Sequence, residues 1–92
     1  MRFTGKKVAV TGASSGIGAA IAEGFAKEGA DVAFLDLDGK RAQEYAALAK
    51  ADYETDCIGL AVDVSNKDSV VNAFKTIEDT YGGLDIFVNC DD

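Results

Sequence analysis

The sequence predicts a doubly wound α/β fold built around one parallel sheet. Short apolar runs alternate with longer helical segments along the whole chain, which is the order of elements in α/β proteins. The apolar runs are nearly continuous, as in parallel strands that are buried on both faces. Glycines at 12, 16 and 18 follow the first apolar run and open the first helical segment. They indicate a tight strand-to-helix turn.

Four segments are expected to form strands. Each is short and rich in β-branched or other apolar residues. Right-handed crossovers between parallel strands place one helix between each consecutive pair. The strand segments are KVAVT at 7–11, DVAFLD at 31–36, CIGLAVDV at 57–64 and LDIFVN at 84–89.

The first helical segment follows the glycines. Ile17, Ala20, Ile21 and Phe25 recur with the helical period, so this face is expected to be buried. Gly29 comes after the last periodic residue and is expected to end the helix.

The second and third helices carry start signals. Asp38 is expected to cap the second helix, which runs through RAQEYAALAK at 41–50. Ser65 followed by Asp68 resembles a capping box that opens the third. Gly82 and Gly83 are expected to end that helix, whose buried stripe would be Val70, Phe74, Ile77 and Tyr81.

Composition excludes several classes of protein. The chain has 92 residues, enough for one domain over 1–92, and a net charge of −7. With nine Lys and Arg against sixteen Asp and Glu, no basic face is expected to bind nucleic acid. No apolar stretch is long enough for a membrane span, and the start lacks a signal-peptide pattern, so a cytoplasmic location is expected. The absence of histidine and of a CxxC pair argues against a metal site.

The glycine loop is a candidate anion site. Gly12, Gly16 and Gly18 stand where the first strand meets the first helix. Backbone N–H groups there, with the positive end of the helix dipole, can bind a phosphate without a basic side chain. A Cβ would block the approach of a pyrophosphate or of the helix to the strand. The alternative is a tight turn with no ligand.

An acidic residue strengthens the nucleotide interpretation. Asp36 ends the second strand segment, 18 positions after Gly18. This is close to the spacing at which a carboxylate accepts hydrogen bonds from an adenosine ribose. Taken alone, Asp36 could equally be a helix cap or a solvated carboxylate. The combination of strand, glycine loop, helix, strand and Asp favours a Rossmann-like dinucleotide site. The loop is not a Walker loop, because no Gly-Lys-Ser/Thr sequence closes it.

These motifs resemble those of the short-chain dehydrogenases/reductases. The Thr-Gly-x-x-x-Gly-x-Gly pattern of that family is matched by Thr11, Gly12, Gly16 and Gly18. Asp63-Val64 is similar to the family's adenine-contacting pair, although Asp63 could instead cap the next helix. GGLDIFVN resembles the run into the family's Asn-Asn-Ala-Gly motif, with Asn89 as its first Asn. The resemblance extends over nearly the whole chain and implies an oxidoreductase that exchanges hydride between a nicotinamide and an alcohol or carbonyl.

The predicted dinucleotide site combines the fingerprint with its neighbours. The resemblance implies a pyrophosphate on the glycine loop, the adenosine ribose at Asp36 and the cofactor near Asn89. The full set of expected cofactor-binding residues is Thr11, Gly12, Ser14, Ser15, Gly16, Ile17, Gly18, Asp36, Leu37, Asp63, Val64 and Asn89.

Charge favours NAD over NADP as the cofactor. A carboxylate at position 36 accepts both ribose hydroxyls of NAD but repels the 2′-phosphate of NADP. The positions where basic residues would attract that phosphate hold Ser15 and Leu37.

The family's catalytic residues have no counterpart in the chain. In the family a Ser and a Tyr-x-x-x-Lys pair transfer the proton, but the residues four positions after Tyr45, Tyr53 and Tyr81 are Ala49, Cys57 and Asp85. The chain is therefore expected to be the amino-terminal cofactor half, truncated before the catalytic half and inactive alone.

The carboxyl end departs from the family pattern as well. Cys90, Asp91 and Asp92 stand where Asn-Ala-Gly is expected, and two carboxylates near a phosphate are expected to weaken NAD binding. The expected strand order of 3-2-1-4 would leave the fourth strand at an edge where the family continues its sheet. Two of the three crossover helices would cover one face of the sheet and only the third the other. Self-association through that strand or face is therefore expected.

Two competing interpretations remain open. The chain could be a folded structural or self-association fragment without useful cofactor binding. Alternatively, it could act as an enzyme only when a second polypeptide supplies the catalytic half. The substrate and the direction of the reaction are not encoded in these residues.

Overall fold

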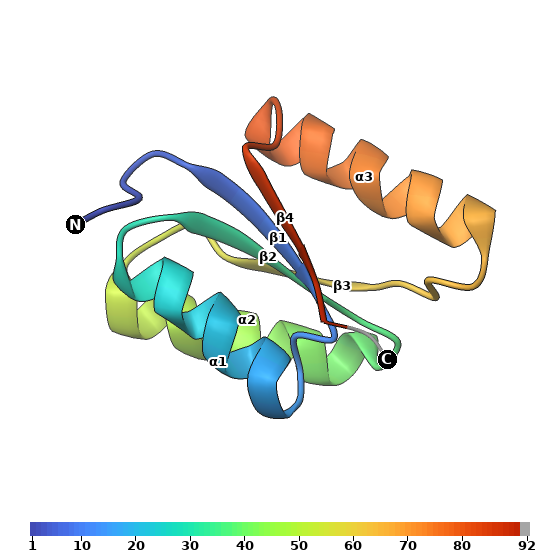
Figure 1. The fold of residues 1–92 in the computed structure, drawn as a ribbon, viewed down its shortest axis with the longest axis horizontal. Helices are drawn as coiled ribbons and strands as arrows, with labels where there is room; N and C mark the ends of the chain where they lie inside the picture. Colours follow the sequence, from blue (N-terminus) through green and yellow to red (C-terminus); the bar gives the residue numbers. More distant parts are fainter. Residues whose placement is uncertain (91–92) are drawn as a thin grey trace.

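The computed structural model describes residues 1–90, which form four strands and three helices in strict alternation (Figure 1). This order is the one predicted for a βαβαβαβ chain. The bounds are β1 Lys7–Thr11, α1 Gly16–Lys27, β2 Asp31–Asp36, α2 Gly39–Tyr53, β3 Ile58–Ala61, α3 Lys67–Tyr81 and β4 Ile86–Asn89.

The four strands make one parallel sheet in the order β3-β2-β1-β4. The predicted order of 3-2-1-4 is confirmed. Thr11 at the end of β1 pairs with Leu35 of β2 on one side and Asn89 of β4 on the other. All four strands therefore end at the same edge of the sheet, where the β1–α1 turn also lies.

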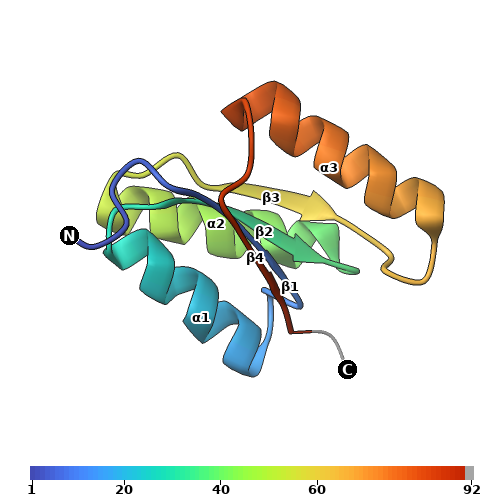
Figure 2. The same cartoon turned by 45° about the horizontal axis from the view of Figure 1, so that its top comes forward.

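Helices cover the two faces of the sheet unequally (Figures 1 and 2). α1 and α2 pack on one face around Val8, Val10, Val32 and Phe34. α3 packs alone on the other face, where Ala9, Ala33, Leu35, Val62, Ala73 and Ile77 are buried. Two helices on one face and one on the other is the predicted arrangement.

α2 lies very close to β3, and a glycine makes this possible. A Cβ on Gly59 would lie 2.4 Å from the amide nitrogen of Gln43 and 2.5 Å from the carbonyl oxygen of Ala42. The helix in turn presents small side chains, since Ala42, Ala46 and Ala49 are its buried residues. Close contact of backbone with backbone replaces the interdigitation of large side chains here.

The predicted buried face of α1 is partly wrong. Ile17 is 77% exposed and Ala20 is also exposed, while Ile21 and Phe25 pack against the core. Gly18, Ala22 and Ala26 are the buried residues of the helix. Because α1 packs closely on the sheet, the residues that face the sheet are the smallest ones of the helix. The larger apolar residues of α1 lie to the side of this row or in solvent.

Gly24 is a weak point of α1 that carries no packing role. A Cβ there would meet nothing within 4 Å, and glycine in a helix interior costs about 1 kcal/mol relative to alanine. Gly24→Ala is therefore expected to raise the free energy of unfolding by about 1 kcal/mol. Urea unfolding followed by circular dichroism measures this, and an unchanged or lower stability would contradict the assignment.

The start of α3 differs from the sequence prediction. Asn66 is the N-cap, and its side chain accepts a hydrogen bond from the Ser69 amide at 3.1 Å. The predicted capping box from Ser65 to Asp68 is wrong, because the Ser65 hydroxyl instead donates to the Asp63 carboxylate at 2.6 Å. Asp38 does cap α2 as predicted, accepting from the Arg41 amide at 3.1 Å.

Strand β4 lies at an edge of the sheet. Among residues 1–90 it pairs only with β1, and its Phe87 side chain, on the α3 face, is 46% exposed. The Phe87 and Phe74 rings lie 5.5 Å apart, so α3 covers only part of this strand. β3 and β4 are both shorter than predicted, starting at Ile58 and Ile86.

Candidate functional site

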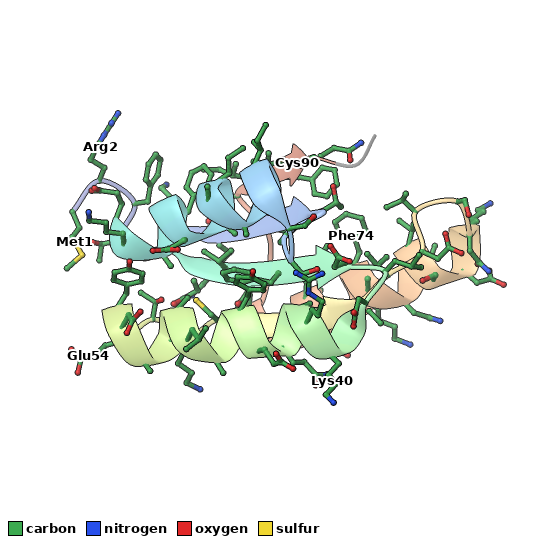
Figure 3. All side chains as sticks on the ribbon, turned by 90° about the horizontal axis from the view of Figure 1, so that it is seen from below. Met1, Arg2, Lys40, Glu54, Phe74 and Cys90 are labelled. Carbon is green, nitrogen blue, oxygen red and sulfur yellow. The ribbon has the colours of Figure 1, made fainter. Side chains whose placement is uncertain are left out.

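A wide cleft lies at the carboxyl edge of the sheet, where β1 turns into α1. It has a volume of about 730 Å³ and is bounded by the glycine loop on one side and by Asp36 and Cys90 on the others. In Figure 3 Cys90 lies well away from Met1 and Glu54, which are both at the left of the view. The lining residues are Gly12, Ser15, Gly16, Ile17, Gly18, Asp36 and Cys90.

The glycine loop brings the first turn of α1 to the cleft. Ser15 is the N-cap, but its side chain makes no capping hydrogen bond. The first amides of a helix have no acceptor within the helix, and Gly16, Ile17 and Gly18 all line the cleft. The site therefore combines backbone donors with the positive end of a helix of 12 residues.

Glycine is required at position 18 by the packing of α1 against the loop, whether or not a ligand is bound. A Cβ at this position would lie 2.0 Å from the carbonyl oxygen of Gly12, far inside any allowed approach. The close contact fixes the first turn of α1 directly over the end of β1. Gly12 itself has a φ of 64°, in the left-handed region that glycine adopts without strain.

Asp36 is held in place by the loop that it faces. Its two carboxylate oxygens accept hydrogen bonds from the Ser14 amide at 3.2 Å and from the Asp38 amide at 3.0 Å. Burial raises the pKa of Asp36, but these hydrogen bonds and the charge of Arg41 outweigh burial and hold the pKa below its ordinary value. The carboxylate is ionised at neutral pH and keeps lone pairs for further donors.

Thr11 and Asn89 join β1 and β4 next to the cleft, although neither residue lines it. The buried Thr11 hydroxyl donates to the side-chain oxygen of Asn89 at 2.7 Å and accepts from the Cys90 amide at 3.0 Å. Thr11 thus positions the segment that follows β4. Ser14, also buried, contributes its amide to Asp36 and does not line the cleft.

The remaining predicted residues lie farther round the same edge. Leu37 is 75% exposed and Val64 is 50% exposed, and neither lines the cleft. Asp63 accepts hydrogen bonds from the Ser65 amide and hydroxyl, which lower its pKa against a small effect of burial. Its side chain forms a turn and does not cap α3. Asp91 and Asp92 lie outside the described residues.

Cys90 is the one lining residue that the sequence analysis did not include. It is partly buried, and both it and the buried Cys57 are free thiols. Its place could have been inferred from Asn89, because the residue after a parallel strand enters the same edge as the glycine loop. No group of three or more potential metal ligands occurs within residues 1–90, and none of the helices there is long and apolar enough to cross a membrane.

Comparison with known proteins places this geometry in a family. The family model described as short chain dehydrogenase matches residues 6–90. The chain belongs to the short-chain dehydrogenase family. The match includes the glycine loop, Asp36 and Asn89, and it confirms the resemblance that the sequence motifs indicated.

Relatives in this family are dehydrogenases and reductases. D-threitol dehydrogenase of Mycolicibacterium smegmatis is 42% identical over 88 residues, which cover 96% of this chain and 34% of the relative. 3beta-hydroxysteroid dehydrogenase of Mediterraneibacter gnavus is 44% identical over 90 residues, which cover 96% of this chain and 32% of the relative. The chain thus spans about a third of the length of these relatives.

A solved structure shows the same fold at high similarity. L-sorbose reductase from Gluconobacter frateurii, complexed with NADPH and L-sorbose, superposes with a TM-score of 0.93 at 39% identity, over 98% of this chain and 34% of that protein. The parallel sheet and three helices of this chain therefore have the fold of the corresponding third of that reductase.

Proposed function

We propose that this chain binds a nicotinamide dinucleotide, with NAD preferred over NADP, as the cofactor-binding part of a short-chain oxidoreductase. The observation that carries the proposal is the cleft in which the glycine loop and Asp36 face each other. When bound, such a cofactor supplies hydride exchange with an alcohol or carbonyl substrate. The chain's own residues bind and orient it.

The pyrophosphate is assigned to the glycine loop. The amides of Gly16, Ile17 and Gly18 begin α1 and line the cleft, so they can donate to phosphate oxygens without any basic side chain. Ser15 is exposed at the N-cap of α1, next to these amides. The net charge of −7 makes these directed backbone dipoles the main source of attraction.

Asp36 is assigned to the adenosine ribose. Each carboxylate oxygen already accepts one backbone hydrogen bond, which fixes the group's orientation while leaving lone pairs for two ribose hydroxyls. Its lowered pKa keeps it charged, which favours NAD because a 2′-phosphate would meet a negative charge. Arg41 is a cation close enough to affect the charge of Asp36. L-sorbose reductase binds NADPH, but that preference is a property of its own residues and is not transferred to this chain.

The outer residues are assigned to the adenine and to the far end of the cofactor. Leu37 and Val64 present exposed apolar surface beyond Asp36, which suits the faces of an adenine ring, with Asp63 beside them. Asn89 is held by Thr11 next to the cleft, where the nicotinamide side of the molecule would lie.

Proton transfer is not assigned to this chain. None of its three tyrosines is followed four positions later by a lysine, and the described residues hold no other base beside a nucleophile in the cleft. The oxidoreductase activity is thus proposed only for a protein in which this cofactor-binding part is combined with the Ser, Tyr and Lys of the family. A folded fragment without useful cofactor binding is the alternative.

A titration of the ¹⁵N-labelled chain with NAD tests the proposal. We expect amide shifts confined to residues 12–18, 36–37, 63–64 and 89–90, with weaker and similarly placed shifts for NADP. Dispersed spectra that do not change at millimolar NAD would overturn the proposal in favour of the structural fragment.

We also propose that the chain self-associates through the edge of β4 and the partly covered face beside it. Phe87 lies 46% exposed on this strand, and unpaired edges pair readily with other copies. Phe87→Lys is expected to shift the sedimentation profile toward monomer. Val71→Lys, on an α3 residue that is 54% exposed, is the matched control and should leave the profile unchanged. A wild-type chain that sediments as a monomer at high concentration would contradict this proposal.

A further inference from the structure

A second cavity lies between α1 and α2, on the face of the sheet that carries both helices. Its volume is about 140 Å³, and it shares no lining residue with the cleft at the glycine loop. The side chains come from three elements, with Phe34 of β2 beneath the two helices. The lining residues are Ala19, Glu23, Phe34, Tyr45, Leu48, Ala49, Asp52 and Tyr53.

Small side chains create the space. Ala19 of α1 and Ala49 of α2 contribute only methyl groups. The ring of Phe34, 1% exposed, closes the bottom of the hollow as part of the core, while the partly buried Tyr45 and Tyr53 pack against the same core. The cavity is thus lined partly by apolar groups and partly by the carboxylates and phenols of the longer side chains.

The rim carries negative charge. The Tyr53 hydroxyl donates to the Glu23 carboxylate at 2.8 Å across the two helices. This hydrogen bond raises the pKa of Tyr53, and burial and the charges of Glu23 and Asp52 raise it further. No lining residue is cationic. Arg41 lies in the adjoining hollow, which it lines with Glu44, Tyr45 and Leu48.

Size and charge together define the ligand. A volume of about 150 Å³ accommodates a benzene-sized molecule, so this hollow has room for a single aromatic ring. Two carboxylates at the rim attract a cation, and tyrosine rings beside them favour it further. We propose that this cavity binds a small aromatic amine, with the ring between Tyr45 and Leu48 and the ammonium group beside Glu23 and Asp52. The proposal is independent of the dinucleotide site.

Benzylamine and benzyl alcohol, which have the same ring but different charge, test this assignment. In an amide NMR titration, benzylamine is expected to shift residues 19–23 and 45–53 with a dissociation constant in the millimolar range. Benzyl alcohol is expected to bind about threefold or more weakly, because it makes no ion pair. Absence of shifts in these two segments at saturating benzylamine would overturn the proposal and identify the cavity as a packing void.

Three variants separate the charge from the cavity. Glu23→Gln is expected to weaken benzylamine binding by roughly three- to tenfold, whereas Glu78→Gln, on α3 across the sheet, removes the same charge and should have no effect. Ala19→Leu fills the space and is expected to abolish binding while the dispersed spectrum is retained. Equal affinities of the wild type and Glu23→Gln, or of the amine and the alcohol, would overturn the assignment of an amine.

Discussion

Replacing Gly18 by alanine is expected to abolish measurable dinucleotide binding and to lower the free energy of unfolding by about 2 kcal/mol. The added Cβ would lie 2.0 Å from the Gly12 carbonyl oxygen. Relief of this clash requires a shift of roughly 1 Å between α1 and the loop, and shifts of that size cost about a hundredfold in site function. The backbone donors at the start of α1 would then no longer converge on one phosphate position.

Urea unfolding and an NAD titration of the same sample measure the two effects separately. Gly24→Ala is the matched control, because it makes the same substitution in the same helix at a position where a Cβ meets nothing within 4 Å. The two variants should change stability in opposite directions. A Gly18→Ala chain with wild-type stability and NAD affinity would show that the contact with Gly12 is not required.

Asp36→Asn is expected to change the ratio of NADP to NAD affinity by at least about tenfold in favour of NADP. A hydrogen bond to a charged group contributes about 1.5–3 kcal/mol, and the neutral amide loses part of that for the ribose hydroxyls. It also removes the repulsion of a 2′-phosphate, while the neighbouring Arg41 remains. The dissociation constants of both dinucleotides, measured by calorimetry at one ionic strength, give this ratio.

Asp38→Asn is the control for the loss of charge. Asp38 lies two positions farther along, is exposed and caps α2, and Asn is an equally good N-cap. This variant should leave the cofactor ratio nearly unchanged. If both variants shift the ratio equally, the preference arises from the net charge of the region and not from a carboxylate on the ribose.

The sequence was sufficient for the topology and for the position of the glycine loop. Apolar runs buried on both faces identify parallel strands, and the alternation with helices determines the crossovers. The clearest success is Gly18, whose close contact with Gly12 is the packing role that the spacing of the glycines predicts. Asp36 likewise lies opposite this loop, as the distance between the motifs indicates.

The helix-to-sheet contacts were less predictable. Hydrophobic periodicity assigned Ile17 to the core, but it is 77% exposed at the cleft, because α1 approaches the sheet through Gly18, Ala22 and Ala26. Periodicity measures the apolar character of a face and does not report how closely a helix can approach. The predicted start of α3 was wrong for a related reason, since Ser65 and Asn66 are both favourable N-cap residues. The Ser65 hydroxyl is engaged by Asp63 in the preceding turn, so Asn66 is the residue that caps the helix.

The hydrogen bond from Thr11 to Asn89 joins residues 78 positions apart in the sequence. The glycine loop already depends on β2, because the Ala13 amide donates to the Leu35 carbonyl and the Ser14 amide donates to Asp36. Its Thr11 hydroxyl receives the Asn89 partner only when β4 has docked beside β1. Closure of so long a loop is an entropically costly step. During synthesis on the ribosome, the cleft therefore becomes complete only after almost all of these residues have emerged, and cofactor binding would stabilise the last strand to join.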